Sequence, residues 1–95
     1  MIFRTILVAL VFTAGPALAQ QVVELKPGPG QDVASVRCAA CHSLNYIRMN
    51  SPFLSPDGWK AEVGKMRKVF GAPMEDAEEA TIISYLVANY GAPAK

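Results

Sequence analysis

Residues 38–42 read Cys38-Ala39-Ala40-Cys41-His42, and they contain both cysteines and the single histidine of this 95-residue chain. The two thiols lie three positions apart, so that they share one turn of a helix, and the histidine follows the second thiol directly. This spacing is the pattern of covalent attachment of a c-type haem, with one thioether bond from each cysteine to a vinyl group. The histidine is then directed beneath the iron, and His42 is the predicted proximal ligand.

Other chemistries of the same residues fit the chain less well. A structural zinc site would need four ligands, and no further cysteine or histidine is present. A thioredoxin-type redox pair usually lies beside a βαβ pattern, which the sequence lacks. A disulfide between Cys38 and Cys41 would suit an exported protein, but it would leave His42 without a role and a small core without filling. We therefore prefer one covalent haem, with the disulfide and the redox pair as open alternatives.

A methionine sulfur is the predicted sixth ligand of the iron, because no second histidine exists, and a thioether raises the reduction potential relative to histidine. Met49 is too close to His42 along the chain to reach the opposite face of a haem comfortably. Met66 and Met74 remain, and we prefer Met66 because it lies on the apolar stripe of a predicted helix. Either methionine could instead fill the core, and an open sixth position would make the protein a haem sensor or peroxidase.

Three further residues are predicted to lie around the haem. Tyr46 and Trp59 would pack against its edge, although aromatic residues are also common core filling. Arg48 would pair with a propionate, or would be a solvated loop arginine. A backbone carbonyl near Ser51-Pro52 is expected to hold the second ring nitrogen of the histidine, since metal-binding imidazoles usually need such a partner.

The chain around the motif predicts an all-α fold with three main helices around one haem. The first helix would open with Asp32 as its N-cap and run into the cysteines, and residues 43–56 would form a loop. Ser55-Pro56-Asp57 is a strong helix start, with a capping hydroxyl, a proline at the first helical position and an acid in the first turn. The apolar stripe of this second helix has helical spacing and comprises Trp59, Val63, Met66 and Phe70.

The third helix would begin near Glu75 or Asp76, where acids suit the positive end of the helix dipole. Gly71 would end the second helix and Gly91 the third. Gly64, inside the second helix, costs about 1 kcal/mol relative to alanine, so we expect it to allow a close backbone approach. The apolar face of the third helix comprises Ile82, Ile83, Leu86, Val87 and Tyr90.

The N-terminal segment has the layout of a secretory signal. Arg4 precedes an apolar run that is too short for a comfortable membrane span, and Ala17-Leu18-Ala19 forms a small-x-small cleavage site. We expect cleavage after Ala19 and a periplasmic location without stable membrane insertion, an uncleaved anchor being the alternative. The domain prediction is a signal peptide (1–19), an extended arm (20–31), either disordered or a strap, and the haem domain (32–95).

The charge of the chain argues against nucleic-acid binding. Arg4 is the only charged residue of the first nineteen, so the remainder carries eight basic and eight acidic residues, without the net basic character that such binding usually needs. The charges cluster by helix, which indicates solvated helix faces more than a docking patch. The basic cluster is Lys60, Lys65, Arg67 and Lys68, and the acidic cluster is Glu75, Asp76, Glu78 and Glu79.

The haem motif between an N-terminal helix and a C-terminal helix carrying Tyr85-Leu86 resembles class I cytochrome c, over essentially all of the chain after the signal. The strings VRCAACHSLNYI (36–47), WKAEVGKMR (59–67) and FGAP (70–73) are similar to the small cytochrome subunit of bacterial sulfite dehydrogenase. One departure is the order Pro73-Met74, where many class I cytochromes have Met-Pro in the ligand loop. This departure also favours Met66 as the ligand.

The resemblance implies a function. The haem would carry single electrons from a molybdenum subunit that oxidises sulfite to a downstream cytochrome. The chain itself has no nucleophile, general base or substrate pocket that the sequence identifies, so catalysis would belong to the partner. A freely diffusing periplasmic electron carrier is the alternative of the same class, and the sensor or peroxidase with an open iron site is the alternative of another class.

Overall fold

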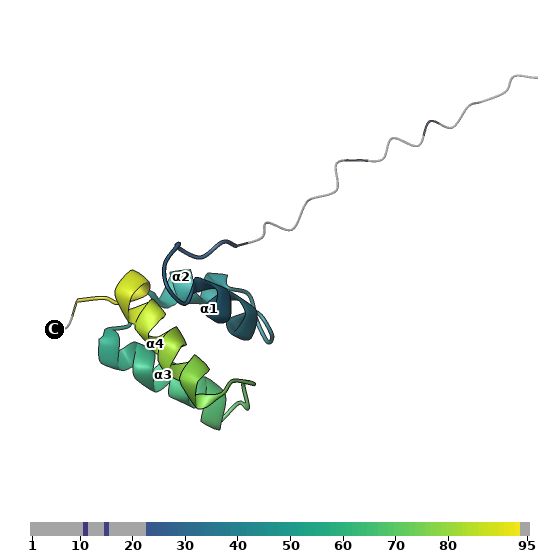
Figure 1. Ribbon diagram of the computed structural model, residues 1–95. Coiled ribbons are helices and arrows are strands. Elements are labelled where there is room, and N and C mark those ends of the chain that lie inside the picture. Colours follow the sequence, from purple (N-terminus) through teal and green to yellow (C-terminus); the bar gives the residue numbers. More distant parts are fainter. Residues whose placement is uncertain (1–10, 12–14, 16–22, 94–95) are drawn as a thin grey trace, which may run out of the picture.

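The computed structural model describes Val11, Gly15 and residues 23–93, and this part of the chain is helical without a strand. The predicted all-α fold is therefore confirmed (Figure 1). Apart from Val11 and Gly15, the predicted signal peptide lies outside the described residues, as do residues 20–22 of the predicted arm. None of the helices within the described part has the length and apolar content that a membrane span requires. The helices are α1 (Gln31–Cys38), α2 (Asn45–Asn50), α3 (Pro56–Lys68) and α4 (Asp76–Tyr90).

Two of the three predicted helix starts are confirmed. Ser55 caps α3, where its hydroxyl oxygen accepts a hydrogen bond from the backbone N–H of Gly58 at 3.2 Å. Glu75 caps α4 through a reciprocal capping box with Glu78. The predicted N-cap of the first helix is wrong, because α1 begins at Gln31 and Asp32 lies in its first turn.

The predicted loop 43–56 contains a short helix, which corrects the sequence prediction. α2 is six residues long, and its N-cap residue, Leu44, has no side chain that can cap it; the Ser43 hydroxyl accepts a hydrogen bond from the Asn45 N–H at 3.1 Å. The buried face of α2 is provided by Ile47 alone. A segment this short is not held by its own helix propensity, so packing against the rest of the domain stabilises it.

The core forms where α4 packs against both α1 and α3 (Figure 1). Its largest fully buried side chains are Trp59 from α3 and Tyr85 from α4. Trp59 donates its indole N–H to the backbone oxygen of Tyr90 at 2.8 Å, and the Ser51 hydroxyl donates to the same oxygen at 2.8 Å. The carbonyl oxygen of the last residue of α4 is therefore satisfied by two side chains. The full buried cluster comprises Leu25, Ala34, Ile47, Trp59, Val63, Ile82, Tyr85, Leu86 and Tyr90.

Residues 23–30, here called the strap, lie against α4 although they precede every helix. Leu25 is buried in the core. The backbone of Lys26 is held from both sides, because Tyr85 donates its hydroxyl to the Lys26 oxygen at 2.5 Å and Tyr90 accepts from the Lys26 N–H at 2.8 Å. The Lys26 ammonium lies 4.7 Å from the centre of the Tyr90 ring, a cation–π contact. The strap thus joins the segment before α1 to the last helix.

Two glycines behave differently from each other. Gly30 has a φ of +91°, and a Cβ there would lie 3.0 Å from Tyr85 Cβ and 3.1 Å from Thr81 Cγ2. This position needs glycine both for its left-handed backbone and for the close packing of α1 on α4. The predicted close approach at Gly64 is wrong, because a Cβ there would meet no atom within 4 Å.

Candidate functional site

A small apolar hollow lies where the end of α1, the end of α3 and the loop before α4 meet. It encloses about 60 Å³, or about 390 Å³ when the space open to solvent is included. The lining is contributed by three separate parts of the chain and is mainly apolar. These residues are Arg37, Cys38, Cys41, His42, Met66, Phe70, Ala72 and Met74.

The two cysteines have different surroundings within this hollow. Cys38 is the last residue of α1 and packs against the core, and its burial raises the pKa of the thiol. Cys41 lies in the turn after α1 and is exposed. Both are free thiols. The Cys38 thiol is thus partly buried at the end of the helix, and the Cys41 thiol is exposed, although both residues line the hollow.

His42 projects from the turn after α1 and is exposed. Its Nδ1 lies 2.9 Å from the backbone oxygen of Ser43. With the proton on Nδ1, this contact leaves the Nε2 lone pair free for a metal. The acceptor predicted near Ser51-Pro52 is therefore wrong, because the neighbouring residue supplies it.

Both predicted methionines reach the hollow. Met66 comes from α3, and Met74 comes from the loop that leads into α4 and also packs against the core. The loop turns at Gly71, whose φ is +72°, and the Ala72 N–H donates to the Met66 oxygen at 3.0 Å. The two candidate thioethers thus stand on either side of one tight turn. The structure brings both beside the motif.

An ion pair stands at the edge of the hollow. Arg37 donates to Glu78 through Nε at 2.9 Å and through Nη2 at 3.2 Å, which is a bidentate geometry. The pKa of Glu78 is lowered, first by the backbone N–H of Glu75 and then by the Arg37 guanidinium. The pair therefore consists of two charged groups, and it links α1 to the first turn of α4.

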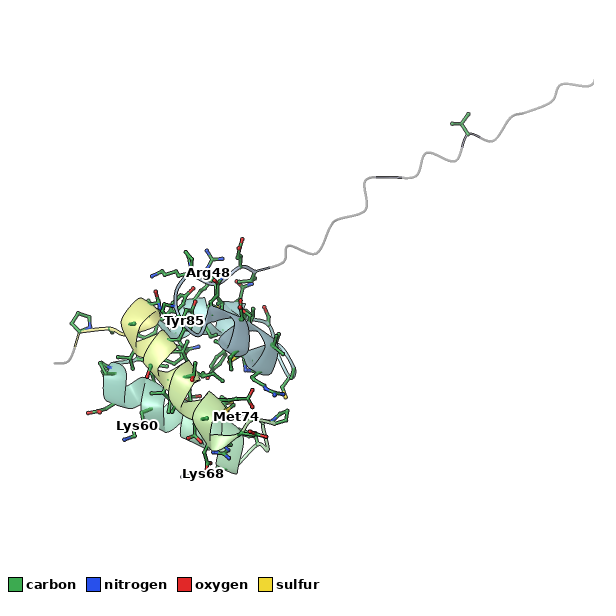
Figure 2. All side chains as sticks on the ribbon, in the orientation of Figure 1. Arg48, Lys60, Lys68, Met74 and Tyr85 are labelled. Carbon is green, nitrogen blue, oxygen red and sulfur yellow. The ribbon has the colours of Figure 1, made fainter. Side chains whose placement is uncertain are left out.

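The three residues predicted around the haem lie in different places. The Tyr46 ring is 5.0 Å from the His42 ring, centre to centre, and its hydroxyl donates to Glu62 at 3.0 Å. Trp59 is in the core, and neither it nor Arg48 is among the residues that line the hollow. Figure 2 shows Arg48 on α2 and Met74 at the opposite end of the domain, where α4 begins. Trp59 and Arg48 thus lie apart from the residues that line the hollow, and their contact with a haem stays a prediction.

The sequence reasoning did not assign Arg37, Phe70 or Ala72 to the site. Phe70 follows α3 on the same apolar stripe as Met66, and its side chain is 67% exposed. The apolar stripe could have identified Phe70. An exposed aromatic residue at the end of such a stripe, near the haem motif, indicates a surface that a bound group covers. Arg37 is adjacent to Cys38, but nothing in the sequence pairs it with Glu78.

The chemistry of these residues fits a haem. Two free thiols, an imidazole with one nitrogen available and two thioethers converge on one hollow. The walls are apolar, as a porphyrin face requires, and Phe70 offers an exposed ring to cover. Cys38 and Cys41 would hold the group, His42 would bind the iron, and Met66 or Met74 would approach from across the hollow.

The comparisons with known proteins agree with this chemistry. No curated protein matches the chain. A family model described as the haem-binding domain of the quinohemoprotein amine dehydrogenase A alpha subunit matches residues 28–94, more than two thirds of the chain. The match spans the motif, the hollow and all four helices. The chain therefore belongs to this family of haem-binding domains.

Proposed function

We propose that the chain is a monohaem c-type cytochrome of the class I type that transfers single electrons. The observation that carries this proposal is the convergence of the two thiols, His42 and two methionine sulfurs on one apolar hollow. Haem iron supplies a one-electron couple between its ferric and ferrous states. Cys38 and Cys41 would attach the group, and His42 with Met66 or Met74 would supply ligands to its iron. No substrate needs to enter for that activity.

The proposed setting is the periplasm, with export directed by residues 1–19 and cleavage after Ala19. The proposed partners are a molybdenum-containing sulfite dehydrogenase subunit as electron donor and a downstream cytochrome as acceptor. The resemblance of residues 36–47 and 59–67 supports this choice of donor. The matching family model is also named after a dehydrogenase subunit, which supports a role beside an oxidoreductase.

Covalent attachment is tested by haem staining after denaturing electrophoresis of the protein expressed with export and haem-attachment machinery. The wild-type band should stain, and its mass should equal residues 20–95 plus one haem. The double variant Cys38→Ala/Cys41→Ala should be unstained, whereas Ser84→Ala, at an exposed position of α4, should stain like the wild type. A colourless wild-type protein with its two sulfurs joined to each other would overturn the proposal.

The sixth ligand is tested by Met66→Leu and Met74→Leu, which keep volume and remove sulfur. We expect the ferric wild type to show the weak far-red absorption band of a methionine sulfur on iron, and Met66→Leu to abolish it. Loss of the band only in Met74→Leu would transfer the ligand role to the loop. A wild type that lacks the band and binds carbon monoxide rapidly would favour the sensor or peroxidase.

The partner is tested by fractionating periplasm in moderate salt and analysing what elutes with the haem protein. Co-elution with a molybdenum protein and sulfite-dependent reduction of the haem are the expected results. A haem protein that always elutes alone, and that sulfite with this fraction does not reduce, would contradict the subunit role and favour the diffusing carrier.

A further inference from the structure

The Arg37–Glu78 pair differs from the other interhelical ion pairs of the described residues in its position. Of the residues in these pairs, Arg37 alone lines the hollow. Arg67 also bridges to the first turn of α4, with Nη1 at 2.5 Å from both Asp76 and Glu79, but it is not among the lining residues. Within the described residues, two arginines thus bind to the first turn of α4, and only Arg37 lines the hollow.

The two charged side chains of this pair are only partly buried. The side chains of Arg37 and Glu78 are 37% and 25% exposed, so water screens them only in part. The remaining lining residues are neutral apart from the titratable groups of the motif. A guanidinium at the rim thus places a positive charge beside a largely apolar site, and the bound carboxylate offsets that charge.

We propose that the two charges of the Arg37–Glu78 pair tune the reduction potential of the haem site in opposite directions, with Arg37 raising it and Glu78 moderating that effect. The reduced site carries one positive charge less than the oxidised site, so a nearby cation favours reduction and a nearby anion opposes it. The pair acts through the field at the hollow, and both residues are positioning residues. This inference rests on the proposed function, because it requires a haem in the hollow.

The test uses two variants that break the same ion pair but leave opposite charges behind. Arg37→Gln leaves the Glu78 carboxylate and should lower the midpoint potential, whereas Glu78→Gln leaves the Arg37 guanidinium and should raise it. In each case the equilibrium constant for electron exchange with a mediator dye should change by about threefold or more. Arg37→Gln/Glu78→Gln should lie between the two single variants, since it removes both charges. The readout is spectroelectrochemical titration of the purified holoprotein at neutral pH.

Controls separate the charge effect from a loss of packing. Arg37→Lys keeps the positive charge, so its midpoint potential should stay close to that of the wild type, although the bidentate geometry is lost. Arg67→Gln breaks the ion pairs of the other arginine and should shift the potential less than Arg37→Gln. The shifts should shrink in high salt, which screens partly exposed charges. Thermal unfolding of each variant measures how far the ion pair itself supports the fold.

The outcomes distinguish the two proposals. Opposite shifts in the two single variants support the tuning role. Shifts of the same sign, or none, in variants that carry haem normally would overturn the tuning role and leave the pair as a structural clamp. A wild-type protein without haem would instead overturn the proposed function.

Discussion

The two ends of this small domain are built in opposite ways. The strap end contains Leu25, Lys26, Trp59, Tyr85 and Tyr90, and its large side chains are buried with their polar atoms paired inside the chain. The motif end, comprising Cys38, Cys41, His42, Met66, Phe70 and Met74, has free thiols, an exposed imidazole and an exposed phenylalanine ring around a hollow. One end is complete in itself, and the other presents apolar surface and donors that fit a haem.

This difference shows how a domain of this size divides its stability. A short chain buries too little surface to be generously stable by itself, and a covalent group or staple often supplies the remainder. Here the internal packing is concentrated where the strap, α3 and the end of α4 meet. The lining of the site is left to pack against its cofactor.

Trp59→Ala should give the largest loss, because it breaks the strap end at its largest buried side chain. We expect the free energy of unfolding to fall by about 3–5 kcal/mol, as for other buried aromatic truncations, and the Tyr90 oxygen loses one of its two donors. Urea titration of the holoprotein measures the change. Phe53→Ala, at a side chain that is 81% exposed, should cost under about 1 kcal/mol. Equal losses in both variants would remove the distinction between buried and open regions.

Loss of the haem should affect the motif end more than the strap end. In Cys38→Ala/Cys41→Ala, we expect amides of residues 69–75 to exchange roughly ten- to a hundredfold faster than in the holoprotein, about 1.4–2.7 kcal/mol of local stability. Amides near Tyr85–Tyr90 should change less. Hydrogen exchange followed by mass spectrometry reads both regions in one sample. Uniform acceleration along the chain would mean that the two ends unfold as one unit.

Tyr85→Phe should release the strap at one hydrogen bond. The Lys26 oxygen then loses its donor, which should cost about 1–3 kcal/mol. Burial, with the neighbouring Tyr90, raises the pKa of Tyr85 to about 12 from an ordinary value of 10.0. The folded state therefore keeps this proton longer than the unfolded state, so the stabilisation is complete below pH 10 and is lost as the pH rises from 10 to 12.

Measuring unfolding between pH 8 and 12 tests this window. The wild type should lose stability more steeply above pH 10 than Tyr85→Phe does. The same slope in both proteins would contradict the role of this hydroxyl.

Gly64→Ala should have the smallest effect and the opposite sign. The added methyl group meets no atom within 4 Å, and alanine is the better helix former by about 1 kcal/mol. We expect the free energy of unfolding to rise by roughly 0.5–1 kcal/mol. Gly30→Ala, at a positive φ and in close contact with Thr81 and Tyr85, is the matched glycine that should destabilise. A higher free energy of unfolding in Gly30→Ala, or a lower one in Gly64→Ala, would contradict the packing described for these two positions.

Local signals predicted the helices well where a side chain or a special backbone starts or stops them. Ser55-Pro56 begins α3, and Gly71 ends its extension through a positive φ. The prediction failed at α2, whose N-cap residue, Leu44, has no capping side chain and whose buried face is Ile47 alone. Such a helix exists because its surroundings hold it, and no local pattern records those surroundings.

The apolar stripe of α3 illustrates a second limit. Its period correctly placed Trp59, Val63, Met66 and Phe70 on related faces. The hydrophobic period does not show which part of the protein each turn of the helix contacts. In α3, Trp59 contacts the backbone of Tyr90, whereas Met66 lines the hollow. Trp59 lies in the core, and its contact with the haem stays a prediction.

The sequence by itself determined the haem motif and the helical class, because thiol spacing, helix caps and hydrophobic period are local and act within a few residues. Only the tertiary structure decided that both Met66 and Met74 reach one hollow, that Arg37 joins Glu78 at its rim, and that residues 23–30 close over α4. These are contacts between residues distant in sequence, and they depend on how the helices pack in space, which short-range spacing does not encode.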